Sequence, residues 1–338
     1  MNNQYQQQLL SVVVPAYNEQ EVFHEFHRRL SKVLDAIPLL TEIIVVNDGS
    51  RDNTLSILKM LQEEDDRLAI LDLSRNFGKE IALTAGLHRA QGDAVIVIDA
   101  DLQDPPELIP TLVDEWRQGY DVVYAKRIVR EGESFLKRIT AHGFYRLMQH
   151  VGRVKIPEDT GDFRLLSRRA VQALNSLNEQ HRFMKGLFTW IGFPQKAVPY
   201  QRDPRYAGTT KWNYLGLLNL AIEGITSFTT APLRLATYIG LLTAVGAFSY
   251  GLFMIMRTLI FGNPVAGYPS LIVIVLFLGG VQLAAIGVMG EYLGRIFNET
   301  KHRPLYFVDS YSPSRSNPQP DTGPASAGKQ VHSTGLNR

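Results

Sequence analysis

Short apolar runs alternate with helical patterns through the first 130 residues of this 338-residue chain, and this alternation limits the fold most. Runs rich in valine, isoleucine and leucine predict strands at residues 9–15, 42–46, 68–73, 94–98 and 120–125. Apolar residues at helical spacing predict a helix after each of the first three strands. Strand–helix alternation builds a parallel sheet with right-handed crossovers. The first part of the chain therefore predicts a nucleotide-binding type of α/β domain.

Polar and acidic side chains follow several of these strands at the point where each strand ends. They include Glu19, Asp48, Asp99 and Asp101. The carboxyl ends of strands are where ligands bind in an open α/β sheet. Asp99 and Asp101 would face the same way in an extended chain, with no Lys or Arg beside them in the sequence. Such a pair repels unless a cation or hydrogen-bond donors intervene, so the pattern indicates a ligand site, with an acidic cap on the following helix as the alternative.

Several functional classes are excluded or disfavoured by what the sequence lacks. It contains neither a GxxxxGK[ST] loop nor a GxGxxG turn after the first strand, which disfavours ATP hydrolysis and dinucleotide redox chemistry. It contains no cysteine, so thiolate zinc sites and cysteine nucleophiles are excluded. Its formal net charge of +2 gives no reason to expect nucleic acid as a partner.

The composition changes after Lys211, where two long segments without charge follow one another. Residues 235–256 and 269–290 can each cross the apolar core of a bilayer, which takes about 20 residues in a helix. Basic residues flank this hairpin at the two ends away from its turn, and the turn between the spans carries none. This distribution predicts that both termini are cytoplasmic. The predicted organisation is a catalytic domain at 1–212, an interfacial helix at 213–232, transmembrane helices at 233–257 and 269–294, and a tail at 295–338 that is disordered after about residue 310.

Four motifs, in this order and spacing, resemble the inverting family 2 glycosyltransferases of the GT-A fold. They are PAYNE at 15–19, NDGS at 47–50, RNFGK at 75–79 and DADLQDPP at 99–106. The GDFR motif at 161–164, the RYAGTTK motif at 205–211 and the two-span anchor resemble the polyprenyl-phosphate glycosyltransferases, especially the bactoprenol glucosyltransferases. Dolichol-phosphate mannose synthases and undecaprenyl-phosphate aminoarabinose transferases are related families. The resemblance covers about residues 9–307.

The resemblance implies a fold and an activity. The fold is a mixed GT-A (Rossmann-like) sheet with helices on both faces, followed by a two-helix transmembrane hairpin. The activity is transfer of a hexose onto undecaprenyl phosphate with inversion, and the preferred donor is UDP-glucose. The product would modify cell-surface glycans such as the O-antigen of lipopolysaccharide. UDP or GDP donors of GlcNAc, aminoarabinose or mannose remain alternatives, as does a scaffold that binds nucleotide sugars without catalysis. A homo-oligomer such as a tetramer in the inner membrane is also implied.

The resemblance assigns roles to particular residues. The nucleotide-sugar site takes Pro15, Tyr17, Glu19, Asp48, Lys79, Asp99 and Ala100. The metal ligands are assigned to Asp101, Gln103 and Asp99, which would bind Mg²⁺ or Mn²⁺. Asn47 stands where many relatives carry a second aspartate before Asp48. The acceptor phosphate is assigned to Arg127, Arg138, Arg205 and Lys211, whose alternative role is a solvated or lipid-headgroup-binding surface.

Asp162 matches a family position often assigned as the general base, and together with Asp99 and Asp101 it completes the predicted catalytic set. A phosphate monoester is already anionic at neutral pH, because its second pKa is about 6. Such a nucleophile needs cations to position it more than it needs a base. We therefore expect Asp162 to orient the sugar hydroxyls.

Overall fold

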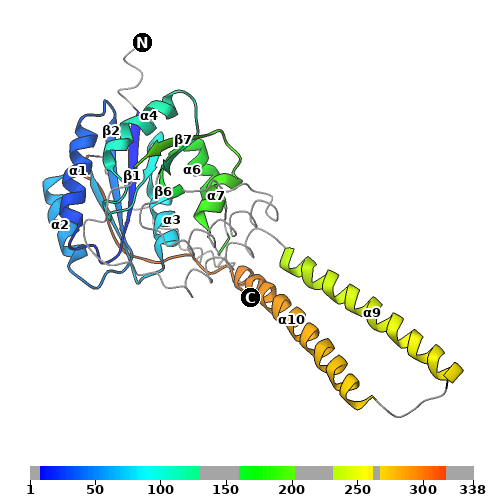
Figure 1. Ribbon diagram of the computed structural model, residues 1–338. Coiled ribbons are helices and arrows are strands. Elements are labelled where there is room, and N and C mark those ends of the chain that lie inside the picture. The colour runs from blue at the N-terminus through cyan, green and yellow to red at the C-terminus, as the bar shows by residue number, and fades with distance from the viewer. Residues whose placement is uncertain are drawn as a thin grey trace, which may run out of the picture.

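The computed structural model describes residues 8–128, 160–177, 179–180, 182–201, 231–261 and 267–316. These residues form one sheet in the order β7-β5-β6-β4-β1-β2-β3-β8, which Figure 1 shows with its helices. The strands are β1 Leu9–Ala16, β2 Leu40–Asn47, β3 Leu68–Leu73, β4 Ala94–Val97, β5 Val122–Arg127, β6 Thr160–Ser167, β7 Gln195–Tyr200 and β8 Val308–Ser312. Only β6 and β8 run against the others within this sheet. The expectation of a mixed α/β sheet is confirmed.

Helices cover both faces of the sheet, because each buried strand sends alternate side chains to opposite sides. One face carries α1 Phe23–Asp35, α2 Thr54–Glu64, the short 3₁₀ helix η1 Pro106–Leu108 and α4 Ile109–Arg117. The other carries α3 Lys79–Arg89, α6 Arg168–Asn175 and α7 Met184–Trp190. In β1, for example, Val12 packs into the first layer and Val13 into the second, and both are fully buried. The layers hold the strand ends rigidly in place.

The strands expected from apolar runs agree closely with those observed, and β3 has the expected bounds. The sequence does not reveal β6, although it lies between β4 and β5 and all of its residues are buried. Two of its residues, Asp162 and Arg164, are charged, and they interrupt the apolar pattern that marks the other central strands. Burial of charge inside a sheet indicates a functional role or a compensating partner.

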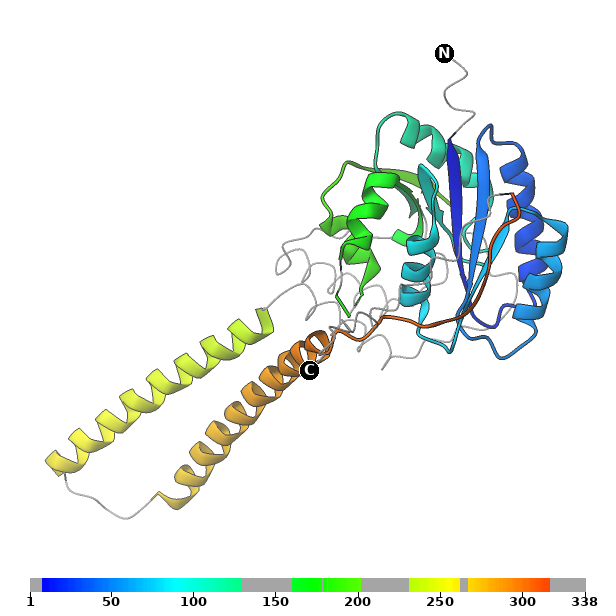
Figure 2. The same cartoon turned by 180° about the vertical axis from the view of Figure 1, so that it is seen from behind.

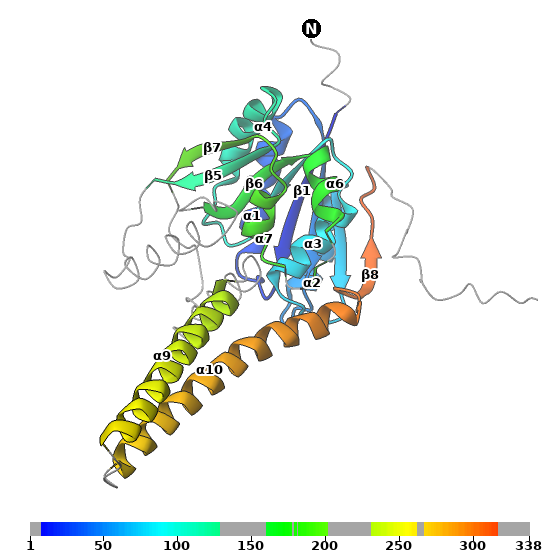
Figure 3. The ribbon, with the colours of Figure 1, turned by 90° about the vertical axis from the view of Figure 1, so that its right-hand side faces the viewer.

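The C-terminal segment returns to the domain as an edge strand. β8 pairs antiparallel with β3, and the Ser74 amide donates to the Phe307 carbonyl at 3.0 Å. Figure 3 shows β8 along the edge of the sheet, directly after the second long helix. The expected disorder after about residue 310 is therefore wrong for residues 311–316. The open edge of β3 presents unpaired backbone groups, and β8 satisfies them despite the polar composition of the tail.

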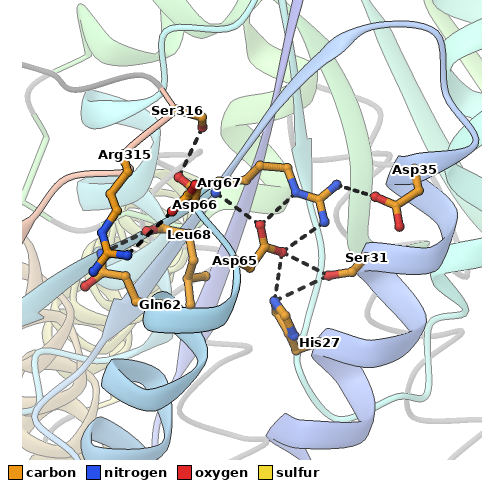
Figure 4. A network of polar contacts seen from close by, with 10 residues as sticks. All are labelled: His27, Ser31, Asp35, Gln62, Asp65, Asp66, Arg67, Leu68, Arg315 and Ser316. Atoms are coloured by element: carbon orange, nitrogen blue, oxygen red, sulfur yellow. Dashed lines mark hydrogen bonds and ion pairs between the residues drawn. The ribbon is translucent and has the colours of Figure 1, made fainter.

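A polar network secures the turn between α2 and β3 (Figure 4). The Asp65 carboxylate accepts from the Arg67 guanidinium at 2.8 and 2.9 Å and contacts the His27 ring at 3.1 Å. These contacts outweigh burial and hold the pKa of Asp65 well below its usual range. The neighbouring Asp66 carbonyl accepts from the Ser316 amide at 3.0 Å. The same turn thus joins α1 to the end of the C-terminal segment.

Two long helices project from the α/β domain (Figures 1 and 2). They are α9 Ala231–Phe261 and α10 Tyr268–Thr300, and each is long and apolar enough to cross a membrane. Their large apolar side chains are exposed, as at Leu242, which is 76% accessible. They contain the expected spans at 233–257 and 269–294. The expected interfacial helix at 213–232 lies outside the described residues, apart from its last two positions.

Candidate active site

Three charged side chains meet at the carboxyl end of the central strands. The Lys79 ammonium, at the start of α3, lies 2.7 Å from Asp99 Oδ2 and 2.5 Å from Asp162 Oδ2. Asp99 follows β4, and Asp162 lies on the neighbouring antiparallel strand β6. A cation for Asp99 thus comes from a residue 20 positions earlier in the chain, and it pairs Asp99 with Asp162.

Two carboxylates share this one ammonium, and their proton affinities separate as a result. Burial alone would raise the pKa of Asp162, but the charges of Lys79 and Lys185 hold it well below the usual range. Burial raises the pKa of Asp99 to about 6, against the attraction of Lys79. Burial and the charge of Asp162 also raise the pKa of Glu80 to about 8. Asp162 is therefore anionic at neutral pH and a weak base.

Each of the two carboxylates keeps one oxygen for a ligand. Asp99 Oδ1 and Asp162 Oδ1 are both buried, and neither accepts a hydrogen bond from the described residues. A buried acceptor without a partner costs free energy, so natural structures rarely retain one without a functional reason. Hydroxyl groups of a sugar or a bound cation would satisfy these oxygens.

The segment Asp99–Asp101 differs from the extended chain that we expected. β4 ends at Val97, and the backbone turns at Ala100 and Asp101. Asp101 Oδ1 accepts from the Gln103 amide at 3.2 Å, and the intervening Leu102 adopts a positive φ of 59°. The alternative of an acidic helix cap is wrong, because no side-chain hydrogen bond caps η1 or α4.

Asp101, Gln103 and Asp99 supply oxygen ligands of the kind that Mg²⁺ and Mn²⁺ prefer. The buried, unpartnered Asp99 Oδ1 fits a cation at this position. Within the described ranges, no group of three His, Cys, Asp or Glu side chains converges, either at this segment or elsewhere. The residues therefore fit a divalent cation only if diphosphate oxygens complete its coordination.

Asp48 supports the loop that carries Lys79. Its two carboxylate oxygens accept from the Phe77 amide at 2.7 Å and the Gly78 amide at 2.9 Å. Burial raises the pKa of Asp48, and the two amide donors partly oppose this effect. Gly49 reinforces the contact, because a Cβ there would lie 2.4 Å from the Arg75 carbonyl carbon. Asp48 thus fixes the backbone one residue before Lys79, and a contact of Asp48 with the nucleoside stays a prediction.

The remaining residues assigned to the nucleotide sugar lie at the carboxyl ends of the paired strands β1 and β4. Pro15 belongs to β1, and Tyr17 and Glu19 follow it, half-buried. Ala100 is buried next to Asp99. The Glu19 amide donates to Thr54 Oγ1 at 2.9 Å, which joins the ends of β1 and α2. Parallel pairing of β1 with β2 and β4 brings these strand ends together.

Among the residues assigned to the acceptor, only Arg127 falls within the described ranges. It ends β5, and its Nε donates to the Tyr200 hydroxyl at 3.3 Å. Arg138, Arg205 and Lys211 lie outside the described residues. The sequence did not single out Tyr200, Glu80 or Lys185. Glu80 directly follows RNFGK but matches no motif residue, Lys185 is close to GDFR only in space, and no local motif marks Tyr200.

A family model and several relatives of known sequence all match this chain as a glycosyltransferase. A model of the family described as glycosyl transferase family 2 matches residues 11–174. An uncharacterized glycosyltransferase of Synechocystis is 52% identical over 88% of this chain and 94% of its own. The bactoprenol glucosyl transferase of Shigella phage SfV is 52% identical over 88% and 97%. A prophage bactoprenol glucosyl transferase homolog of Escherichia coli is 50% identical over 88% and 98%.

Solved structures are more distant. Mannosyl-3-phosphoglycerate synthase of Rubrobacter xylanophilus matches 64% of this chain and 71% of its own, with 17% identity and a TM-score of 0.46. Identity to the phage protein, over most of this chain and nearly all of that protein, carries the assignment instead. The chain belongs to glycosyltransferase family 2 and is a GT-A glycosyltransferase of the bactoprenol glucosyltransferase type.

Proposed function

We propose that this protein transfers glucose from UDP-glucose to undecaprenyl phosphate with inversion at the anomeric carbon. The observation that carries the proposal is the identity of about half of all residues to proteins named bactoprenol glucosyl transferase, from Shigella phages SfV and SfX. The product would be a β-linked polyprenyl-phosphate glucose, which serves as a sugar donor for cell-surface glycans.

The arrangement of Lys79, Asp99 and Asp162 supports transfer to an anionic acceptor. Asp162 is held as a weak base by its contact with Lys79, so it is poorly suited to remove a proton. A lipid phosphate needs no proton removed before it attacks the sugar. The unpartnered oxygens of Asp99 and Asp162 can instead accept hydrogen bonds from sugar hydroxyls and fix the anomeric carbon in line with the incoming phosphate.

A divalent cation forms part of the proposal. Asp101, Asp99 and Gln103 would hold Mg²⁺ or Mn²⁺ against the donor diphosphate. Such a cation offsets the negative charge that develops on the UDP leaving group. The charges of Asp99 and Asp162 raise the pKa of Lys79, so its ammonium remains charged beside them.

The two projecting helices support a location in the inner membrane. Their exposed apolar surface and length suit lipid, which is also where a polyprenyl chain resides. The basic residues at the outer ends of the hairpin favour a cytoplasmic catalytic domain and cytoplasmic termini. Arg257 lies at the opposite end and can reach the headgroups with its long side chain. Association into a homo-oligomer through these helices stays a prediction.

Positive charge near Asp162 supports the acceptor assignment. Arg127 is the cation of the proposed acceptor set that the structure places beside β6. Arg138, Arg205 and Lys211, which lie outside the described residues, would complete the set. Four cations could hold the acceptor phosphate against the repulsion of the donor diphosphate.

A panel of nucleotide sugars tests the donor and the reaction together. The full-length protein in detergent is incubated with undecaprenyl phosphate, Mg²⁺ or Mn²⁺, and UDP-glucose, UDP-GlcNAc, UDP-aminoarabinose or GDP-mannose in turn. The organic extract is then analysed by mass. A hexose adduct with UDP-glucose supports the proposal, and a different sugar adduct corrects the donor. Binding of UDP-sugar without any lipid product would favour a scaffold.

A further inference from the structure

Three side chains from separate parts of the sheet form a chain of hydrogen bonds beside the site. The Tyr200 hydroxyl, at the end of β7, donates to Asp104 Oδ1, which follows the DADLQ segment. The Arg127 guanidinium, at the end of β5, donates from Nε to the same hydroxyl at 3.3 Å. β5 and β7 pair in parallel with Arg127 opposite Tyr200, so the sheet register brings these two residues together.

The direction of these hydrogen bonds follows from the chemistry of the groups. An arginine only donates, an ionised carboxylate only accepts, and a phenol carries one proton. Tyr200 therefore gives its proton to Asp104 and accepts from Arg127. Burial and the Asp104 charge raise the pKa of Tyr200, so the phenol stays protonated. Tyr200 is 5% exposed and Asp104 is 1% exposed, which leaves little freedom for either side chain.

Close packing on β6 fixes the other side of the arginine. A Cβ at Gly161 would lie 3.0 Å from Arg127 Nη2 and 3.6 Å from Asp104 Oδ2. The guanidinium therefore rests on the bare backbone of Gly161, immediately before Asp162. Although burial disfavours its charge, Tyr200, Asp104 and Asp162 raise the pKa of Arg127 and keep the guanidinium charged.

We infer that Tyr200 is a positioning residue: anchored by Asp104, its hydroxyl holds the Arg127 guanidinium over Gly161, where it receives the phosphate of the acceptor. The inference rests on the proposed function, because the acceptor role of Arg127 belongs to it. Tyr200 does not touch the substrate. It fixes the Nε side of the guanidinium and leaves the two terminal nitrogens to bind phosphate oxygens as a fork.

The test compares variants of the full-length protein in detergent with UDP-glucose and undecaprenyl phosphate. Tyr200→Phe keeps the ring and removes the hydroxyl. We expect the KM for the lipid phosphate to rise about tenfold, because the arginine loses its orientation, with the KM for UDP-glucose unchanged. Tyr120→Phe is the matched control, since Tyr120 precedes β5 at the opposite end of the strand from Arg127. Thermal unfolding of each variant checks that the fold is retained.

A double-mutant cycle separates positioning from a structural role. In an Arg127→Ala background, Tyr200→Phe should have no further effect on the KM for lipid phosphate. Gly161→Ala should mimic Tyr200→Phe, because its new Cβ displaces the same guanidinium. An equal effect of Tyr200→Phe with and without Arg127 would overturn the inference, as would an unchanged lipid KM in the single variant.

The failure of the proposed function gives a different result. If the wild-type protein forms no glucosylated lipid phosphate, the proposed reaction is wrong before any variant is compared. If the wild type is active and Arg127→Ala leaves the lipid KM unchanged, the acceptor role of Arg127 is wrong, and the inference about Tyr200 is wrong with it. Both results are distinct from loss of coupling in the double-mutant cycle.

Discussion

The Lys79 ammonium lies 2.5 Å from the Asp162 carboxylate, although 83 residues separate them in the chain. Lys79 begins α3, and Asp162 lies on β6, which runs antiparallel to its neighbours β4 and β5. The contact closes the site between the RNFGK and GDFR motifs. It also holds the pKa of Asp162 below that of Asp99, so Asp162 is the carboxylate that stays ionised to lower pH.

Replacing Lys79 tests this arrangement. Lys79→Met leaves the carboxylates of Asp99 and Asp162 without their shared cation, so they repel each other and the donor diphosphate. We expect kcat/KM to fall by at least about 100-fold, which is the cost of removing one preorganised donor that stabilises a developing negative charge. Lys59→Met, at an exposed position on α2, is the control and should leave the rate unchanged. A Lys79→Met variant with wild-type kinetics would remove the ion pair from the mechanism.

Asp162→Asn separates the orienting role from general-base catalysis. The amide keeps the shape of the side chain and cannot act as a base. Because the lipid phosphate is already anionic, we expect turnover to fall about tenfold and remain measurable. Single-turnover kinetics with UDP-glucose binding measured in parallel provides the check. Complete loss of transfer with unchanged donor binding would assign Asp162 as the base.

Glu80→Gln tests the raised pKa of the half-buried carboxyl group next to Lys79 through its effect on stability. The folded-state pKa of Glu80 is about 8. That value lies above the unfolded value of about 4.3, so the folded protein binds the extra proton between these two pH values. Stability therefore falls as the pH rises through this window. Glutamine carries no such penalty, so the midpoint of thermal unfolding should rise by about 2–4 °C at pH 8 and change little near pH 4.

The control for this experiment is Glu63→Gln, at an exposed position on α2. It should change the midpoint of thermal unfolding only slightly, and by the same amount at pH 4 and at pH 8. A Glu80→Gln variant whose midpoint does not depend on pH differently from the wild type would contradict the elevated pKa.

The C-terminal segment, residues 301–316, links the second long helix α10 to the loop that carries Lys79. Phe307 packs against Phe77 with ring centroids 6.5 Å apart, and the Tyr306 hydroxyl contacts His88 Nδ1 at 3.0 Å. A chain that ends after Arg303 loses these contacts and β8. We expect its unfolding midpoint to fall by about 5 °C, because the edge of β3 is exposed. We also expect the KM for UDP-glucose to rise.

The matched control for this truncation ends after Ser316, so it retains β8 and the contacts of Ser316 with Asp66. It should behave as the full chain does. Equal stability and equal donor KM in the two truncated chains would show that β8 does not support the site. Phe307→Ala isolates the ring contact from the strand pairing.

Local sequence patterns predict the buried strands and the two long apolar helices. Buried strands such as β3 have continuous apolar runs, and α9 and α10 have long segments without charge. β6 escaped prediction because Asp162 and Arg164 break its apolar pattern, and β8 because its polar residues pair only with an edge. Both strands depend on partners that are distant in the chain.

The same distinction applies to the candidate site. Asp99 and Lys79 stand in recognisable motifs, and their motifs indicated a donor site. The contact of Lys79 with Asp162 and the hydrogen bonds of Tyr200 arise from sheet order and register, which a single sequence does not specify. An apolar strand pattern also does not predict the turn at Asp101, because β4 already ends at Val97.

The mass of the lipid product tests the central claim most directly. The full-length protein, UDP-glucose, undecaprenyl phosphate and Mg²⁺ or Mn²⁺ are incubated, and the organic extract is analysed by mass spectrometry. The account predicts undecaprenyl phosphate that has gained one hexose residue with the wild type, and no such product with an Asp101→Ala variant that remains folded and membrane-bound. Absence of this product with the wild type, or its formation at a normal rate by Asp101→Ala, would contradict the account.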